Sequence, residues 1–258
     1  MEHIRLERED EILVITLARG KANALTDALV AELQQALNHA ESDPHTRAVV
    51  LTSAQPRMFC AGFDVEDVFT YEPVRMRTFA RAFFRVFDTL RCLPKPVVAG
   101  LTGHTFAAGA ILALVCDVRV MSEGDFGFAL NEVNLGVVLP ARMIRALASE
   151  IPLQTGHALF LEGHVFKTSD ARRAGLVDEL VPAGNVAFRT ATRARELGHK
   201  PPRAFAGHKR ALVEVAGGPP YTDADLDAMV DEFLDYWDGD ECRERRAALT
   251  KSLKQPEA

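Results

Sequence analysis

Strand-like and helix-like segments are mixed along the first part of this chain, and helical patterns alone occupy the remainder. Short apolar runs predict strands at residues 12–17, 48–52, 97–100, 118–121 and 126–128. Helical spacing predicts helices after an N-cap at Thr26 and at residues 76–90, 140–150, 153–161, 169–174, 186–198 and 203–215. Two glycines and two prolines at residues 217–220 make the strongest break. This order predicts an α/β fold with a helical C-terminal segment.

Charge and hydropathy exclude several classes of protein. The 258 residues carry 30 Lys and Arg against 36 Asp and Glu, a formal net charge of −6, which is unfavourable for binding nucleic acid. The longest apolar run, residues 106–116, is roughly half of the ~20 residues that a membrane-spanning helix needs. The first ten residues are too charged for a targeting peptide. Four dispersed cysteines without a CxxC pair suit a reducing compartment, so we expect a cytoplasmic protein.

Common cofactor and metal motifs are missing from the sequence. It contains no GxGxxG, P-loop, GxSxG or HExxH pattern. His157 and His164 are the nearest histidine pair at helical spacing, and they stand two helical turns apart, too far for a usual shared ligand set. We therefore expect no metal site.

Two segments rich in small residues each follow a predicted strand. They span residues 59–64 and 103–110, and the second opens an apolar helix. Each segment can present an unpaired backbone N–H to a ligand oxygen, and small side chains allow close approach. Tight packing alone explains the same composition, and composition by itself favours that simpler explanation.

Five motifs in family order make the sequence resemble the crotonase superfamily, the enoyl-CoA hydratase/isomerase family. The motifs lie at residues 21–25, 59–64, 95–99, 103–119 and 167–178. The resemblance implies a spiral of β-β-α units at residues 1–198 and a C-terminal helical trimerisation region at residues 199–258. It implies a homotrimer or a hexamer of two trimers, and an acyl-CoA thioester as the substrate. No separate cofactor is implied, because CoA is part of that substrate.

The resemblance also implies an oxyanion hole formed by two backbone amides. Carried over residue by residue, these amides belong to Ala61 and Ala108, the second of which stands where relatives usually have glycine. The contacts to acyl-CoA that the resemblance implies are Ala22, Ala24, Ala61, Gly62, Phe63, Asp64, Ala108 and Asn131.

The acid–base residues separate the activities within this family. Hydratases use two glutamates, and Ile111 occupies the position of the first. Residues 130–136, Leu-Asn-Glu-Val-Asn-Leu-Gly, resemble the corresponding segment of monofunctional Δ3,Δ2-enoyl-CoA isomerases. This match implies that Glu132 is the catalytic base, moving a proton from C2 to C4, and that Asn131 contacts the substrate.

Three alternatives stay open at this stage. The first is that the register is wrong and Glu132 faces solvent, as most acidic residues do. The second is that the chain carries out another crotonase-type reaction, such as thioester hydrolysis or slow hydration. The third is that it binds acyl-CoA without catalysis.

Aromatic and charged residues outside the motifs have two interpretations each. Phe63, Phe83, Phe84 and Phe87 line an acyl tunnel or belong to the core. Met229, Phe233 and Trp237 form a stripe at fourfold spacing, from which we expect either a subunit contact or packing within the chain. Lys21, Arg57 and Lys251 meet CoA phosphates or are solvated cations. Asp64 is expected to orient its loop, Asp117 to anchor a strand, and Glu123 to lie on the surface.

Overall fold

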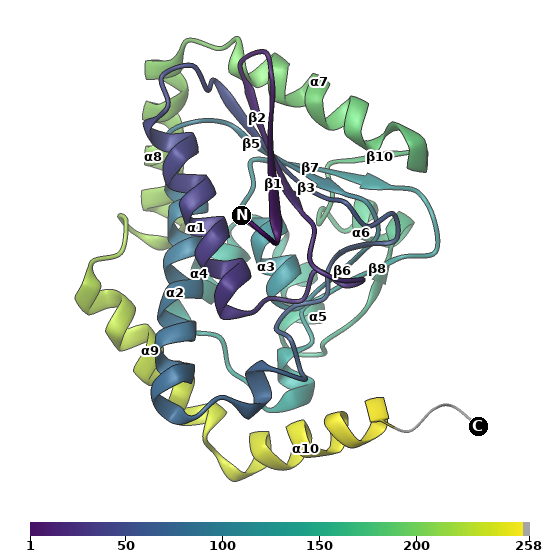
Figure 1. The fold of residues 1–258 in the computed structure, drawn as a ribbon, viewed down its shortest axis with the longest axis vertical. Helices are drawn as coiled ribbons and strands as arrows, with labels where there is room; N and C mark the ends of the chain where they lie inside the picture. Colours follow the sequence, from purple (N-terminus) through teal and green to yellow (C-terminus); the bar gives the residue numbers. More distant parts are fainter. Residues whose placement is uncertain (255–258) are drawn as a thin grey trace.

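The computed structural model describes residues 1–254, and its central element is a six-stranded sheet (Figure 1). The first strand is antiparallel to the second, and the other neighbouring pairs are parallel. In spatial order the strands are β1 (Ile4–Glu9), β2 (Ile12–Leu17), β3 (Ala48–Ser53), β5 (Val97–Leu101), β7 (Val118–Ser122) and β10 (Glu179–Val181).

A second, four-stranded sheet takes the intervening short strands. Its order is β4 (Met58–Cys60), β6 (His104–Phe106), β8 (Gly127–Ala129) and β9 (Phe166–Lys167). The chain therefore alternates between the sheets: β3 and β4 precede α2 (Pro73–Cys92), and β5 and β6 precede α3 (Ala108–Leu114). This repetition confirms the predicted spiral of β-β-α units.

Helices cover both faces of the large sheet, so its four inner strands, β2, β3, β5 and β7, are buried on both sides. Alternate residues of a strand point to opposite faces. On β2, Ile12 and Val14 pack in a cluster with Ala194 of α7 (Val186–Gly198), whereas Leu13 and Ile15 belong to the main core. The main core lies between the sheet and α1 (Asp27–Ser42), α2 and α3.

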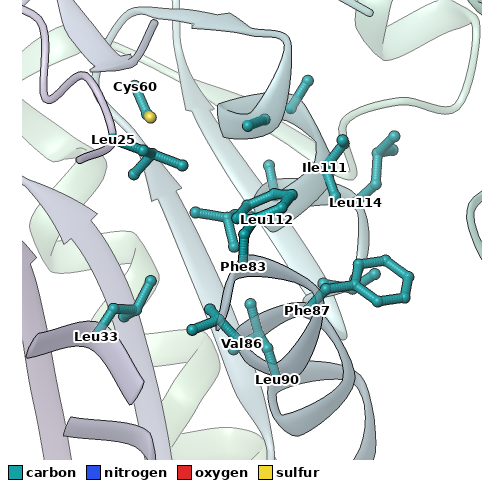
Figure 2. Packing of buried hydrophobic residues seen from close by; sticks show 14 of the residues in the cluster. Leu25, Leu33, Cys60, Phe83, Val86, Phe87, Leu90, Ile111, Leu112 and Leu114 are labelled. Carbon is teal, nitrogen blue, oxygen red and sulfur yellow. The ribbon is translucent and has the colours of Figure 1, made fainter. Parts of the chain in front are cut away.

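Large aromatic side chains of α2 fill the centre of the main core. Figure 2 shows Phe83 and Phe87 of this helix beside Leu112 of α3, and all three are no more than 1% exposed. Burial of a phenylalanine side chain is worth about 1.5–3 kcal/mol. The predicted helix at residues 76–90 is therefore confirmed, and α2 joins the sheet to the later helices.

Four further helices lie close to the predicted ranges: α4 (Ala141–Ala148), α5 (Leu153–Phe160), α6 (Thr168–Arg173) and α8 (Pro202–Gly217). The predicted stripe of Met229, Phe233 and Trp237 lies on α9 (Asp223–Trp237). The sequence does not predict η1 (Val68–Thr70), η2 (Glu132–Leu135), η3 (Ala183–Asn185) or α10 (Asp240–Lys254). Within residues 1–254, no helix has the length and apolarity needed to cross a bilayer. All four cysteines are free thiols.

The stripe on α9 packs inside its own chain. Met229, Phe233 and Trp237 are 2–4% exposed, and the Phe233 ring lies 5.8 Å from the ring of Phe84 on α2. This stripe is thus already covered, and the expectation that it forms a subunit contact is wrong. The trimer now depends on the family resemblance alone.

Candidate active site

An apolar cavity of about 400 Å³ lies between the β-β-α spiral and the C-terminal helices. Its walls come from segments that are far apart in sequence. They include Ala22, Ala24, Ala61, Phe63, Asp64, Phe69, Phe83, Phe84, Ala108, Ile111, Asn131, Glu132, Leu135, Val137, Leu139, Phe233, Trp237 and Leu249. All the predicted acyl-CoA contacts are among these residues except Gly62, which is buried next to the cavity.

The Ala61 amide is already occupied. Its N–H donates a hydrogen bond to the carbonyl oxygen of Ala22 at 3.0 Å. A backbone donor in such a pair is not free to bind a ligand oxygen. The assignment of Ala61 as an oxyanion donor is therefore wrong, although its side chain lines the cavity.

The free amide in this loop belongs to Phe63. Leu25 pairs with Phe63 in an isolated parallel bridge: the Leu25 N–H donates to the Gly62 oxygen at 2.8 Å, and the Asp64 N–H donates to the Leu25 oxygen at 3.0 Å. In such a bridge the polar groups of the middle residue point away from the partner strand. Among the described residues the Phe63 N–H has no acceptor. The first donor thus lies two residues after the predicted one.

The second amide belongs to Ala108, the first residue of α3. The neighbouring Ala107 N–H donates to the Ala129 oxygen at 2.9 Å, whereas the first N–H groups of a helix have no partner within it. The two amide-bearing segments touch, because a β-carbon added to Gly62 would lie 3.4 Å from the Ala108 nitrogen. The free amides of Phe63 and Ala108 therefore belong to adjacent segments, and both residues line the cavity.

Ala107 has a backbone conformation that L-residues rarely adopt. Its φ is 48° and its ψ is −127°, a region that costs a non-glycine residue about 1–3 kcal/mol. The sequence draws attention to alanine at position 108, but Ala108 is helical and carries its methyl group without strain. The strained alanine in this segment is thus Ala107, not Ala108.

Glu132 begins η2 and places its carboxyl group against the cavity. Its Oε2 atom is buried and has no hydrogen-bond partner among the described residues. Burial raises the pKa of Glu132 to about 7, opposed only by a hydrogen bond from its own backbone N–H. The carboxyl group is not solvent-facing, and this alternative is excluded. The Oδ1 atom of Asn131 is likewise buried without a partner.

Ile111 lines the cavity at the position where a hydratase of this family would need its other glutamate. It is 1% exposed and belongs to the main core (Figure 2). Two other acidic residues line the cavity, but Glu66 is exposed and Asp64 is engaged elsewhere. Glu132 is half-buried as a residue, but among the described cavity-lining residues it is the one acid with a buried carboxyl oxygen that has no partner.

Asp64 holds the loop instead of facing a substrate. Its Oδ2 atom pairs with Arg19 at 2.6 Å, and its Oδ1 atom accepts hydrogen bonds from the N–H groups of Glu66 at 3.0 Å and Asp67 at 3.2 Å. These contacts confirm the expected orienting role. Asp117 likewise accepts from the Val97 N–H at 2.7 Å, which confirms that it anchors a strand.

Asn23 supports the same loop and is not singled out by the sequence. Its side chain is fully buried. Its amide nitrogen donates to the Ser53 hydroxyl at 2.7 Å and to the Phe59 oxygen at 3.0 Å, and its Oδ1 accepts from the Arg19 N–H at 2.9 Å. A buried asparagine with such contacts fixes the spacing of the loops that form one cavity wall.

The phenylalanines divide between the cavity and the core. Phe63, Phe83 and Phe84 line the cavity, whereas Phe87 does not and lies 6.4 Å from the ring of Tyr221. The sequence missed Phe69 and Leu249 as wall residues. Lys21, Arg57 and Lys251 do not line the cavity, and their contact with CoA phosphates stays a prediction.

The fold and the site together define a crotonase-type protein: β-β-α units surround an apolar cavity with two adjacent free amides and one buried carboxyl group. The enoyl-CoA hydratase/isomerase family model matches residues 7–250, and the chain belongs to that family.

Proteins named as hydratases and proteins named as isomerases are both similar to this chain. A short-chain-enoyl-CoA hydratase of Clostridium acetobutylicum is 28% identical over 82% of this chain and 81% of its own length. Enoyl-CoA delta isomerase 1, a mitochondrial protein of Rattus norvegicus, is 28% identical over 72% of this chain and 65% of its own. The human mitochondrial Δ3,Δ2-enoyl-CoA isomerase superimposes with a TM-score of 0.93 at 22% identity over 99% of this chain and 100% of that one, a likeness of fold.

Proposed function

We propose that this protein is a Δ3,Δ2-enoyl-CoA isomerase that acts in fatty acid oxidation. The observation that carries the proposal is the single buried carboxyl group of Glu132, which shares the cavity with Ile111 where a second acid would be required. Moving a double bond needs one group to remove a proton and return it. Family membership supports the enoyl-CoA substrate.

The two free amides stabilise the charge that develops in the reaction. The thioester oxygen accepts hydrogen bonds from the N–H groups of Phe63 and Ala108. Removal of a C2 proton forms an enolate whose negative charge spreads onto that oxygen. One oxyanion donor of this kind contributes about 3 kcal/mol, and both donors lower the free energy of the enolate relative to the thioester.

Glu132 transfers the proton. Its carboxylate takes a proton from C2, and the electrons of that C2–H bond form a C1–C2 double bond while the carbonyl π electrons move onto the thioester oxygen. When the carbonyl re-forms, the C1–C2 π electrons become the C2–C3 double bond, and the π electrons of the former C3–C4 double bond take the proton from Glu132 at C4. No atom is gained or lost, and Glu132 is regenerated. A positioned base contributes about 10²- to 10⁴-fold. A pKa of about 7 suits both removal and return of the proton near neutral pH.

Hydration and hydrolysis are less well supported by the same cavity. Both reactions need a water molecule held and activated beside the substrate, and the residue facing this task is apolar Ile111. A binding protein without activity does not need a buried carboxyl group, whose desolvation is unfavourable.

Assembly and location follow from the family resemblance and the thiols. We propose that residues 199–258 mediate a homotrimer or a hexamer of two trimers, and that the protein works in the cytoplasm. Free cysteines suit a reducing compartment. Light scattering at micromolar concentration tests the assembly, and a mass of one 28.3 kDa chain would contradict it.

A spectroscopic assay with 3-enoyl-CoA and 2-enoyl-CoA substrates, run side by side, tests the activity. We expect conversion of the 3-enoyl-CoA and little loss of the conjugated 2-enoyl-CoA to water. The Glu132→Gln variant should lose about 10²-fold or more in kcat while retaining acyl-CoA binding, because the amide preserves the shape of the carboxyl group. Persistent turnover by this variant would show that Glu132 is not the base.

A further inference from the structure

Rings in mutual contact lead from the residue with the free Phe63 amide toward α9. The Phe63 ring lies 5.1 Å from that of Phe83, the Phe83 ring 6.1 Å from that of Phe84, and the Phe84 ring 5.8 Å from that of Phe233. These residues line the cavity together with Ala108 and Glu132, so an acyl chain whose thioester reacts at the free amides under the proposed function extends along the rings toward the C-terminal helices. The proposal below rests on that function.

Trp237 is the last ring of this series and lines the cavity. Its ring lies 5.4 Å from that of Phe233 at an interplanar angle of 27°, and 5.6 Å from that of Phe69 at 73°. Trp237 is 4% exposed. The indole is thus fixed between α9 and η1 and presents a rigid surface to the cavity.

The other side of this wall is polar. The Arg246 guanidinium lies 4.0 Å from the centre of the Trp237 ring, and its Nη2 donates to the Trp237 carbonyl oxygen at 2.9 Å. Arg246 is partly exposed and does not line the cavity. The indole therefore separates an apolar cavity from a partly solvated cation, and this part of the wall is one side chain thick.

The other aromatic rings of this series are backed by the main hydrophobic core. Phe83, Phe84 and Phe233 are 1–2% exposed and belong to the continuous main core. Shortening one of them would leave a void within the core. Leu249 of α10 also lines the cavity but is half-buried, and so lies toward the rim.

We infer that Trp237 is the specificity-determining residue that limits acyl-chain length. A cavity of about 400 Å³ has room for about a dozen groups the size of a water molecule, and the thioester takes part of it. The substrate class is therefore a short to medium unbranched acyl chain. Longer chains are excluded because their ends would displace the indole from Phe233 and Arg246.

Calorimetric titration with saturated acyl-CoAs tests this assignment without requiring turnover. The probes are butyryl-, octanoyl-, dodecanoyl- and hexadecanoyl-CoA, and the variants are Trp237→Ala, Trp237→Leu and Trp237→Phe. In the unaltered protein, affinity should rise by about fourfold per buried methylene up to the limit set by the indole and then fall. Trp237→Ala should improve binding of hexadecanoyl-CoA relative to octanoyl-CoA by about tenfold or more, and Trp237→Phe should lie between the two.

Tyr236→Leu is the matched control, because Tyr236 is the neighbouring aromatic residue on α9, is 46% exposed and does not line the cavity. It should keep the unaltered chain-length profile. If Trp237→Ala fails to fold, Trp237→Leu decides the question. A folded Trp237 variant that binds octanoyl-CoA with the unaltered profile overturns the assignment. Acyl-CoA binding without isomerisation contradicts the proposed function only, whereas absence of any acyl-CoA binding overturns both.

Discussion

Gly62 and Ala107 are in such close contact that a β-carbon on Gly62 would lie 2.7 Å from the Ala107 β-carbon. This contact holds together the two segments that carry the free amides. Gly62 also has a φ of +97°, which L-residues rarely adopt. The position is thus restricted to glycine for two independent reasons, close approach and backbone conformation.

Gly62→Ala should therefore separate the two amides. We expect kcat to fall by about 10²-fold, the usual effect of losing one oxyanion donor, and the free energy of unfolding to fall by about 2–3 kcal/mol. Steady-state kinetics and chemical denaturation measure these effects. Gly20→Ala is the matched control, because Gly20 also has a positive φ of +51° but no atom within 4 Å of an added β-carbon. It should lose stability without losing kcat, and equal losses of kcat would contradict the argument.

Ala107→Gly should stabilise the protein. Glycine relieves the strain at φ 48° and ψ −127°, worth about 1–3 kcal/mol, and gives back about 0.5–1 kcal/mol in backbone entropy. The net gain of about 1 kcal/mol should raise Tm by about 2–4 °C. Ala110→Gly, in the buried interior of α3, should lower Tm instead. A fall in Tm for Ala107→Gly would show that the surrounding structure does not strain residue 107.

The sequence predicts the helices and strands that carry a recognisable apolar pattern within their own residues. It misses the elements that form only through contacts with distant parts of the chain. β2, β3, β5 and β7 are buried on both faces and are read as apolar runs. β1 is an edge strand with five of its six residues exposed, so no hydrophobic pattern reveals it. The break at residues 217–220 likewise falls between α8 and α9, as expected.

The candidate site shows the same division. Glu132, Ile111 and Ala108 all line the cavity, as the register of their local motifs predicts. The donor in the first loop is misplaced because the choice between Ala61 and Phe63 depends on pairing with residues 22–25, which no local pattern encodes. The stripe containing Trp237 is predicted to be either a subunit contact or packed within the chain, and the sequence cannot decide because its partners on α2 and η1 lie about 150 to 170 residues away in the chain.

Activity should depend on ionisation of Glu132. Burial raises its pKa to about 7, and proton removal requires the carboxylate. We therefore expect kcat/KM to rise about tenfold per pH unit below about pH 7 and to level off above it. The pH profile of kcat/KM for 3-enoyl-CoA measures this dependence. Replacing Glu132 by Asp should keep a single rising limb, although at lower activity, whereas a profile that is flat from pH 5 to 8 would contradict the assignment.

The same shift makes a prediction for stability. The folded protein holds the Glu132 proton up to about pH 7, whereas the unfolded chain releases it near its ordinary value of about 4.3. Between these values the folded state binds more protons, so the contribution of Glu132 to the free energy of unfolding falls as pH rises and is constant above about pH 7. At 1.36 kcal/mol per pKa unit, the total loss is about 4 kcal/mol.

Comparing urea denaturation of the unaltered protein and Glu132→Gln at several pH values isolates this contribution, since all other ionisable groups are shared. The difference in unfolding free energy should shift in favour of Glu132→Gln as pH rises from about 5 to 7, because the amide remains neutral while the carboxyl group must ionise in an apolar cavity. A difference that is independent of pH would mean that the Glu132 carboxyl group has an ordinary pKa, and hence that it is solvated and not facing the cavity.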